Sequence, residues 1–175
     1  MSQKYAFLDR DGLLIYEPPP SATPKGQIPY QIDSLEKLKV LDGVIEGLQK
    51  LLSADYKLIM ISNQDGMGTD IFPEHNFWAP QNELIRILAE NEIVFTKAFI
   101  CPHLPEDNCD CRKPKTGLVD EFFRENDVDL KNSFMSGDRN TDRQFAENLG
   151  IRFFPAETNG SFDAVIKQLN LLNND

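Results

Sequence analysis

Five short apolar segments recur along this chain, and the stretches between them are long enough to form helices. Each segment is too short for a helix and is rich in Ile, Phe, Met or Leu, which is typical of strands covered on both faces. Between the segments, apolar residues recur at helical spacing, as at Val44, Leu48 and Leu51. This alternation predicts an α/β fold, with a doubly wound, mostly parallel sheet and helices on both faces. The predicted strands span residues 5–8, 57–61, 96–100, 133–135 and 151–154, and further helical patterns span residues 84–88, 118–123 and 162–172.

Two segments interrupt the alternation and are predicted to be loops. Residues 17–29 contain five prolines and no apolar periodicity, so we expect a loop inserted after the first strand. Residues 101–112 form a second insertion, after the third strand. Helix-end signals follow the fourth strand: Thr141 and Gln144 have the spacing of a capping box, and Gly150 has the position of a C-terminal helix cap.

Size and charge restrict the classes of function. The chain has 175 residues, 41% apolar and 26% charged, with a net charge of −10. Since no interdomain linker stands out, we expect a single domain over residues 1–175. The negative charge disfavours nucleic-acid binding, because phosphate neutralisation requires clustered Lys and Arg. No window approaches the roughly 18 apolar residues of a membrane span, so we expect no membrane contact and a cytoplasmic location.

Four polar clusters each follow a predicted strand or an insertion. The carboxyl ends of parallel strands lie at one edge of a sheet, so we expect these clusters to meet in one crevice. Each cluster alone has an ordinary structural explanation as a turn, a helix start or a solvated lysine. Their order and their shared position at strand ends favour a catalytic site instead. The clusters contain Asp9 with Asp11, Ser62 with Asn63, Lys113, and Asp138 with Asp142.

These residues resemble the four ordered motifs of the haloacid dehalogenase superfamily of phosphatases, which have a Rossmann-like fold. The longer stretches Asp-Arg-Asp-Gly, Ile-Ser-Asn-Gln-Asp-Gly, Cys-Asp-Cys-Arg-Lys-Pro-Lys and Gly-Asp-Arg-x-Thr-Asp resemble the histidinol-phosphate phosphatase domain of histidine biosynthesis. The resemblance implies a phosphomonoesterase that hydrolyses L-histidinol phosphate. In some bacteria that domain is fused to an imidazoleglycerol-phosphate dehydratase domain. The resemblance leaves open whether this chain belongs to such a longer protein.

The resemblance also implies a role for each matched residue. Asp9 is the nucleophile that forms an aspartyl-phosphate, and Asp11 is the general acid and base. Mg²⁺ is the catalytic cofactor, held by the side chains of Asp9 and Asp138 and by the backbone carbonyl of Asp11. Lys113 neutralises charge on the phosphoryl group and on Asp9. The supporting residues are Ser62 and the Asn63 backbone amide, which hydrogen-bond phosphoryl oxygens, and Asp142, which orients Lys113 or a metal-bound water.

A second set of ligands lies in the second insertion. Cys101, His103, Cys109 and Cys111 supply three sulfurs and one imidazole within eleven residues, which matches a tetrahedral Zn²⁺ site. The alternative is three free thiols and a surface histidine. Because four protein ligands leave no open position, we expect a structural zinc that makes the loop rigid. The histidinol-phosphate phosphatase domain and a heptose-bisphosphate phosphatase both resemble this loop.

Leu13 and Glu17 are two further positions that bear on turnover and on substrate recognition. Leu13 stands where the family usually has Thr or Val, and a shift of the loop by its larger side chain would slow turnover. Glu17, in the first insertion, is hypothesised to receive the ammonium group of histidinol.

A heptose-1,7-bisphosphate 7-phosphatase and a nucleic-acid 3′-phosphatase are alternatives within the class of phosphatases. A catalytically silent, zinc-stabilised binding module is the alternative from a different class.

Overall fold

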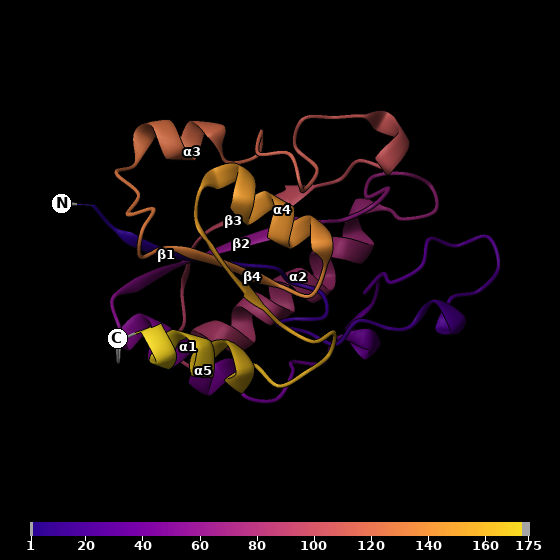
Figure 1. Cartoon of the computed structure of the whole chain (residues 1–175). Coiled ribbons are helices and arrows are strands. Elements are labelled where there is room, and N and C mark those ends of the chain that lie inside the picture. Colours follow the sequence, from indigo (N-terminus) through magenta and orange to yellow (C-terminus); the bar gives the residue numbers. More distant parts are fainter. Residues whose placement is uncertain (1, 173–175) are drawn as a thin grey trace.

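The sheet is built as the alternation of segments predicts. In the computed structural model, which describes residues 2–172, every strand pairing within the sheet is parallel. β1 lies in the middle, between β2 and β4 (Figure 1). Each predicted strand is confirmed to within two residues. In the spatial order β3-β2-β1-β4-β5, the bounds are Phe95–Cys101, Tyr56–Asn63, Lys4–Leu8, Phe134–Gly137 and Arg152–Pro155.

Helices cover both faces of this sheet, as predicted for a doubly wound fold. Figure 1 shows α3 and α4 on one side of the sheet and α1 and α5 on the other. α3 begins two residues later than its apolar pattern suggests. The helices are α1 (Val44–Ser53), α2 (Glu74–Glu90), α3 (Asp120–Glu125), α4 (Asn140–Leu149) and α5 (Asp163–Leu172), with 3₁₀ turns at Pro20–Ala22, Leu35–Lys37 and Pro105–Asp107. None of the helices within residues 2–172 has both the length and the apolar composition of a membrane-spanning segment.

β1 is apolar and buried from Tyr5 to Leu8, because both faces of the strand are covered there. Tyr5 and Phe7 pack on the side of α3, where Phe122 meets each ring edge-on. Ala6 and Leu8 pack on the opposite side, in the cluster that contains the apolar residues of α1, α2 and α5. Burial of each large side chain contributes about 1.5–3 kcal/mol. The strand is thereby fixed in register, and the residue that follows it is held at a defined place.

One predicted helix signal is wrong. α4 begins directly after Arg139, whose backbone N–H donates a hydrogen bond to Asp142 Oδ2 at 3.0 Å. The Asp142 carboxylate, at the third helical position, therefore accepts a hydrogen bond from the backbone N–H of the residue that precedes the helix. Thr141 and Gln144 do not form the expected capping box. The predicted C-terminal cap is confirmed, since Gly150 has φ 69° and ends the helix in a left-handed conformation.

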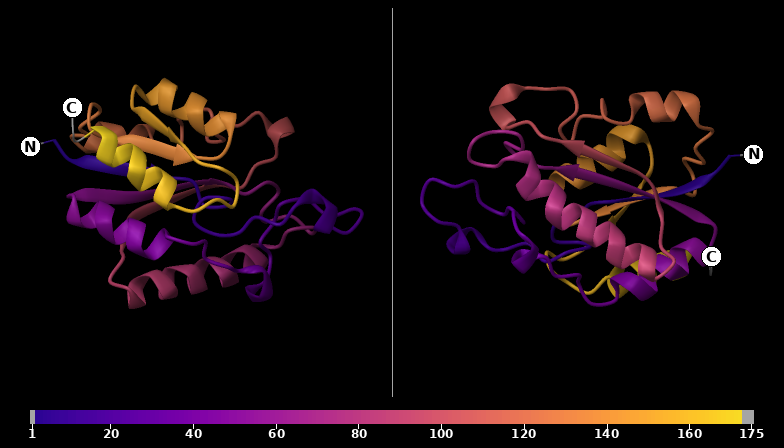
Figure 2. Two further views of the ribbon diagram at one scale, coloured as in Figure 1. Left: turned by 60° about the horizontal axis from the view of Figure 1, so that its bottom comes forward. Right: turned by 180° about the vertical axis from the view of Figure 1, so that it is seen from behind.

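Both inserted loops project from the carboxyl edge of the sheet. In Figure 2 the indigo segment after β1 and the salmon segment after β3 extend from the same end of the molecule. The chain continues from β1 to β2 and β3 on one side and later adds β4 and β5 on the other. Such a reversal of strand order opens a crevice between the carboxyl ends of β1 and β4. The fold thus places the polar clusters and both insertions around one crevice.

Candidate active site

Two of the predicted metal ligands follow adjacent strands of the sheet. Asp9 comes directly after β1, and its backbone N–H donates to the Ser136 carbonyl of β4 at 3.0 Å. Asp138 comes directly after β4, and Asp142 lies in the first turn of α4. These three carboxylates each place an oxygen within 4.8 Å of the others. The fold therefore brings together the acidic residues that the sequence places far apart.

Lys113 lies between two of these carboxylates. Its Nζ is 2.9 Å from Asp9 Oδ1 and 2.6 Å from Asp142 Oδ1, and it also donates to the Ile61 carbonyl at 3.1 Å. All three side chains of this ion-pair group are buried. Asn63 holds the lysine backbone, because its side-chain amide accepts from the Lys113 N–H and donates to the Lys113 carbonyl. The lysine ammonium is thus fixed beside the predicted nucleophile.

The electrostatics of this group favour an additional cation. Burial, and after it the charge of Asp142, raise the pKa of Asp9 to about 8, although Lys113 opposes both effects. Burial alone would lower the pKa of Lys113, but Asp142 and Asp9 outweigh burial and raise it. One lysine therefore balances only part of the negative charge of three neighbouring carboxylates. A divalent cation at this position would lower the pKa of Asp9 and keep it ionised.

The residues present fit such a cation. Asp138 Oδ1 is buried and has no hydrogen-bond partner among the described residues, while its Oδ2 accepts from Thr158 Oγ1 at 2.6 Å. A buried carboxylate oxygen without a partner is costly, and a cation would satisfy it. Gly12 leaves room here, since a Cβ at this position would lie 2.8 Å from Asp138 Oδ2. Oxygen ligands of this kind suit Mg²⁺.

Asp11 is held by two donors on the other side of the crevice. Arg10 Nη1 and Gln64 Nε2 each lie 2.6 Å from one of its carboxylate oxygens. Gln64 Nε2 also donates to Ser62 Oγ at 2.8 Å and so links the two residues. Arg10 is itself fully buried, with its Nε on Gln81 Oε1 at 2.8 Å. Asp11 and Ser62 are therefore joined through one amide.

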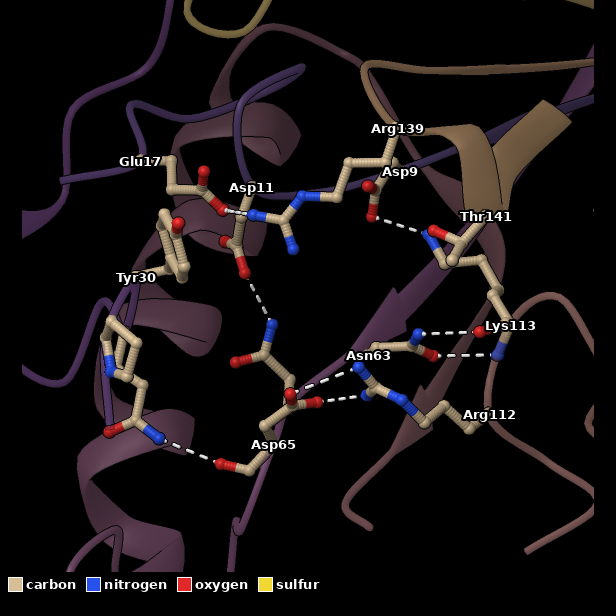
Figure 3. A pocket seen from close by; sticks show the side chains of 13 residues that line it. Asp9, Asp11, Glu17, Tyr30, Asn63, Asp65, Arg112, Lys113, Arg139 and Thr141 are labelled. Carbon is tan, nitrogen blue, oxygen red and sulfur yellow. Dashed lines mark hydrogen bonds and ion pairs between the residues drawn. The ribbon is translucent and has the colours of Figure 1, made fainter. Parts of the chain in front are cut away.

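A pocket opens from these residues toward the first insertion (Figure 3). Glu17 lines it, is buried, and is paired with Arg139, whose guanidinium also lies over the Tyr30 ring at 5.0 Å. Burial raises the pKa of Glu17 to about 7, although Arg139 opposes this shift. Across the pocket, Arg112 pairs with Asp65. The pocket therefore carries carboxylates and cations at both ends.

Leu13 does not line this pocket. Its side chain is 2% exposed and belongs to the apolar cluster on the α1 side of the sheet. The loop that follows Asp9 is closed by backbone bonds, from Leu14 N–H to the Arg10 carbonyl at 2.9 Å and from Gly12 N–H to the Ile15 carbonyl at 2.9 Å. The larger side chain is thus accommodated in the core.

The cysteine and histidine residues of the second insertion form a compact cluster. The three sulfurs are 3.2–3.7 Å apart, and His103 Nδ1 lies 3.1 Å from Cys111 Sγ. These separations are shorter than the edges of a tetrahedron of sulfur ligands around Zn²⁺, which are about 3.8 Å for Zn–S bonds of about 2.3 Å, so the four ligand atoms already lie as one compact group. The three thiols are free. Cys101, His103, Cys109 and Cys111 together could hold one metal ion.

Comparison with known proteins identifies the family of this site. The family model described as "Polynucleotide kinase 3 phosphatase" matches residues 4–159, which include every polar cluster of the crevice and the cysteine loop. The chain belongs to this phosphatase family. A curated relative from Legionella pneumophila (strain Lens), "Histidine biosynthesis bifunctional protein HisB", is 42% identical over 163 residues, which is 93% of this chain and 44% of that protein. The chain spans less than half the length of the curated relatives that it matches.

Solved structures confirm the fold of the family. The D,D-heptose 1,7-bisphosphate phosphatase from B. bronchiseptica, solved with magnesium and phosphate, has a TM-score of 0.75 and 28% identity, and the match covers 95% of this chain and 87% of that one. A haloacid dehalogenase superfamily hydrolase from Ehrlichia chaffeensis, at 16% identity and a TM-score of 0.60, covers 99% of this chain and 100% of that one, and it shares the fold. The haloacid dehalogenase-like fold expected from the motifs is confirmed.

Several residues of this site were not assigned from the sequence. Arg10 and Gln64 lie inside the matched motifs, but nothing in their spacing indicated that both would contact Asp11. Thr158 and Asn159 follow β5 and contact Asp138 and Glu17, respectively. For Thr158 and Asn159, the only local signal in the sequence was an Asn-Gly dipeptide after a predicted strand, which is typical of a turn.

Proposed function

We propose that this chain is a Mg²⁺-dependent phosphomonoesterase that hydrolyses L-histidinol phosphate to L-histidinol and phosphate. The observation that carries the proposal is the buried group at the carboxyl ends of β1 and β4. There Asp9 faces Lys113, and Asp138 keeps one carboxylate oxygen without a partner among residues 2–172. The choice of substrate is supported by the curated relative from Legionella pneumophila, which is named as a histidine biosynthesis protein.

In the proposed first step, Asp9 attacks the phosphorus atom of the ester. A bond forms between the Asp9 carboxylate oxygen and phosphorus, and the bond between phosphorus and the substrate alcohol breaks. Asp11 gives its proton to the leaving alkoxide and becomes a carboxylate. Lys113 balances negative charge near Asp9 throughout. Ser62 and the Asn63 backbone amide are proposed to hydrogen-bond phosphoryl oxygens.

In the second step, water hydrolyses the aspartyl-phosphate. Asp11 removes a proton from water, the water oxygen bonds to phosphorus, and the bond to Asp9 breaks. Arg10 and Gln64 support this half, since both donate hydrogen bonds to the Asp11 carboxylate. A Mg²⁺ ion held by Asp9, Asp138 and the Asp11 backbone carbonyl would neutralise the charge that repels two anions. Asp142 is proposed to orient Lys113, which its Oδ1 contacts.

A phosphate-release assay tests the proposal. Purified protein is supplied with L-histidinol phosphate, heptose-1,7-bisphosphate, 4-nitrophenyl phosphate or a 3′-phosphorylated oligonucleotide, each with and without added Mg²⁺. We expect Mg²⁺-dependent release and a higher kcat/KM for L-histidinol phosphate. A higher kcat/KM for heptose-1,7-bisphosphate would instead indicate the same substrate as that of the B. bronchiseptica phosphatase. No release from any phosphomonoester would favour a silent binding module, and preference for a 3′-phosphorylated oligonucleotide would contradict the proposal.

Glu17 is proposed to recognise the substrate ammonium group, and its replacement tests this role. Glu17 is buried in the pocket wall, where Arg139 already pairs with it, so the ammonium would share or replace that ion pair. We expect Glu17→Gln to lower kcat/KM for L-histidinol phosphate about 10- to 100-fold, as for loss of a hydrogen bond to a charged group. For 4-nitrophenyl phosphate, which has no amine, kcat/KM should stay within about twofold. An equal loss for both esters would assign Glu17 to general pocket structure.

Zinc at the cysteine cluster is proposed to be structural. The loop ends next to Arg112 and Lys113, and Lys115 Nζ donates to the Cys109 carbonyl at 2.8 Å, so disorder of the loop would reach the pocket. We expect removal of zinc with a strong chelator, followed by return of Mg²⁺ alone, to raise KM and to lower the melting temperature. Full activity and stability of a zinc-free preparation would refute this role. Return of Zn²⁺ should restore both quantities.

Residues 1–175 are proposed to act as a single phosphatase domain located in the cytoplasm. The negative net charge of −10 supports a small metabolite rather than a nucleic acid as the substrate.

A further inference from the structure

The turn after β5 contacts three separate parts of the site. Residues 157–160 form a tight turn, closed by a hydrogen bond from Gly160 N–H to the Glu157 carbonyl at 2.8 Å. At its centre, Thr158 and Asn159 face the crevice, where both line a recess beside Asp138. Asn159 has φ 61°, a left-handed conformation that asparagine tolerates better than most residues. The turn is therefore a local unit with two polar side chains directed at the site.

The hydroxyl of Thr158 contacts one of the two carboxylate oxygens of Asp138. Its Oγ1 donates to Asp138 Oδ2 at 2.6 Å, while Oδ1 of the same carboxylate is buried without a partner among the described residues. The carboxylate is thus fixed at one oxygen and free at the other. The Thr158 methyl group lies against Gly12, only 3.3 Å from an ideal Cβ built there, so the threonine also fills the space beside the loop that carries Asp9 and Asp11.

Asn159 connects the turn to the two segments that follow β1. Its backbone N–H donates to the Gly12 carbonyl at 2.8 Å. Its side-chain Oδ1 accepts from the Glu17 N–H at 2.7 Å, and its Nδ2 donates to the Glu17 carbonyl at 3.0 Å. The amide therefore satisfies both backbone groups of Glu17 at once. Since Glu17 begins an irregular, proline-rich loop, these bonds fix where its carboxylate enters the pocket.

We propose that Thr158 and Asn159 are positioning residues with separable functions: Thr158 sets the affinity for Mg²⁺ by orienting Asp138, and Asn159 sets the affinity for substrate by fixing Glu17. This inference rests on the proposed phosphatase function for the Asn159 part, whereas the Thr158 part needs only that Asp138 binds Mg²⁺. Groups that hydrogen-bond a metal ligand typically change metal affinity about 10- to 100-fold when removed. Thr158→Val keeps the shape of the side chain and removes the donor.

Titration calorimetry of the full chain with Mg²⁺ alone tests the first part. We expect Thr158→Val to raise the Kd for Mg²⁺ about 10- to 100-fold, and Thr158→Ser, which restores the hydroxyl, to recover most of the loss. Thr96→Val, on the exposed side of β3, is the matched control and should bind as the parent does. Equal Mg²⁺ affinity in the parent and Thr158→Val would overturn this part. A parent that binds no Mg²⁺ would overturn it as well.

Steady-state kinetics at saturating Mg²⁺ test the second part. Asn159→Gly preserves the left-handed backbone and removes the side chain. We expect it to raise KM for L-histidinol phosphate about 10-fold with an unchanged Kd for Mg²⁺, and to leave KM for 4-nitrophenyl phosphate unchanged. If Asn159→Gly raises KM for both esters or weakens Mg²⁺ binding, the two residues are not separable and the proposal fails. A parent that binds Mg²⁺ but releases no phosphate would end the proposed function and the Asn159 part, and would leave the Thr158 part standing.

Discussion

Replacing Asp9 with asparagine is expected to reduce phosphate release by about 10⁴-fold or more, on the scale at which loss of a nucleophile acts in other hydrolases. An amide nitrogen or oxygen cannot form the acyl-phosphate, because only the carboxylate supplies the attacking oxygen. The amide oxygen of the variant would still accept the hydrogen bond from the Arg10 N–H, which Asp9 Oδ1 now accepts at 2.8 Å. The loss should therefore fall on kcat, measured with L-histidinol phosphate and Mg²⁺.

The same substitution should leave the fold intact. Burial and Asp142 raise the pKa of Asp9, whereas Lys113 lowers it. A neutral side chain at this position removes the cost of burying a charge next to Asp142, but it also removes the ion pair with Lys113. We expect the free energy of unfolding in urea to change by less than about 1 kcal/mol. Glu121→Gln, at an exposed position of α3, is the surface control. Residual activity within tenfold of the parent would exclude Asp9 as the nucleophile.

Replacing Lys113 with methionine is expected to be the most destabilising single change in the site. The variant would leave the Asp9 and Asp142 carboxylates buried without their common cation. Removing one partner from a buried ion-pair group typically costs about 3–5 kcal/mol. We expect a loss of this size in the free energy of unfolding, measured in urea without added Mg²⁺. Lys131→Met, at an exposed position, should change it by less than about 0.5 kcal/mol.

A second substitution separates charge from packing in this group. In Lys113→Met combined with Asp142→Asn, only one of the two carboxylates that contact Lys113 remains, that of Asp9. We expect the double variant to recover at least half of the lost stability, because the repulsion between Asp9 and Asp142 is gone. Activity should stay low in both variants. A single variant as stable as the parent, or a double variant less stable than the single one, would contradict this account of the lysine.

The fold could be predicted closely from the sequence because its signals are local. β1 and β2 are almost uninterrupted apolar runs, since parallel strands in a covered sheet need no polar face. The parallel pairing of the strands was also predicted, because strands that alternate with helices are joined by right-handed crossovers. The order of the strands in the sheet was not predicted and comes from the structure. The capping box at Thr141 was wrong for a local reason: Asp142 reaches the backbone of Arg139 and starts the helix earlier.

The grouping of Asp9, Lys113 and Asp138 was also predictable, because each follows a strand or an insertion and strand ends meet at one edge. The contacts of Thr158 and Asn159 were not. They depend on how the chain turns after β5 and returns to Gly12 and Glu17, which are distant in the sequence. A side-chain amide that binds the backbone of another loop leaves no periodic pattern. Gln64 was missed for the same reason, since its role comes from the placement of Asp11 opposite it.

Detection of a phosphoryl group on Asp9 tests the central claim most directly. The Asp11→Asn variant is mixed with Mg²⁺ and 4-nitrophenyl phosphate, whose leaving group departs without a proton, and is then quenched in acid. Because the variant lacks the base that activates water, we predict that the aspartyl-phosphate accumulates. Mass spectrometry of the digest should find the phosphoryl group on the peptide that contains Asp9. Nitrophenol release with no modified peptide, or with the phosphoryl group on another residue, would contradict the account.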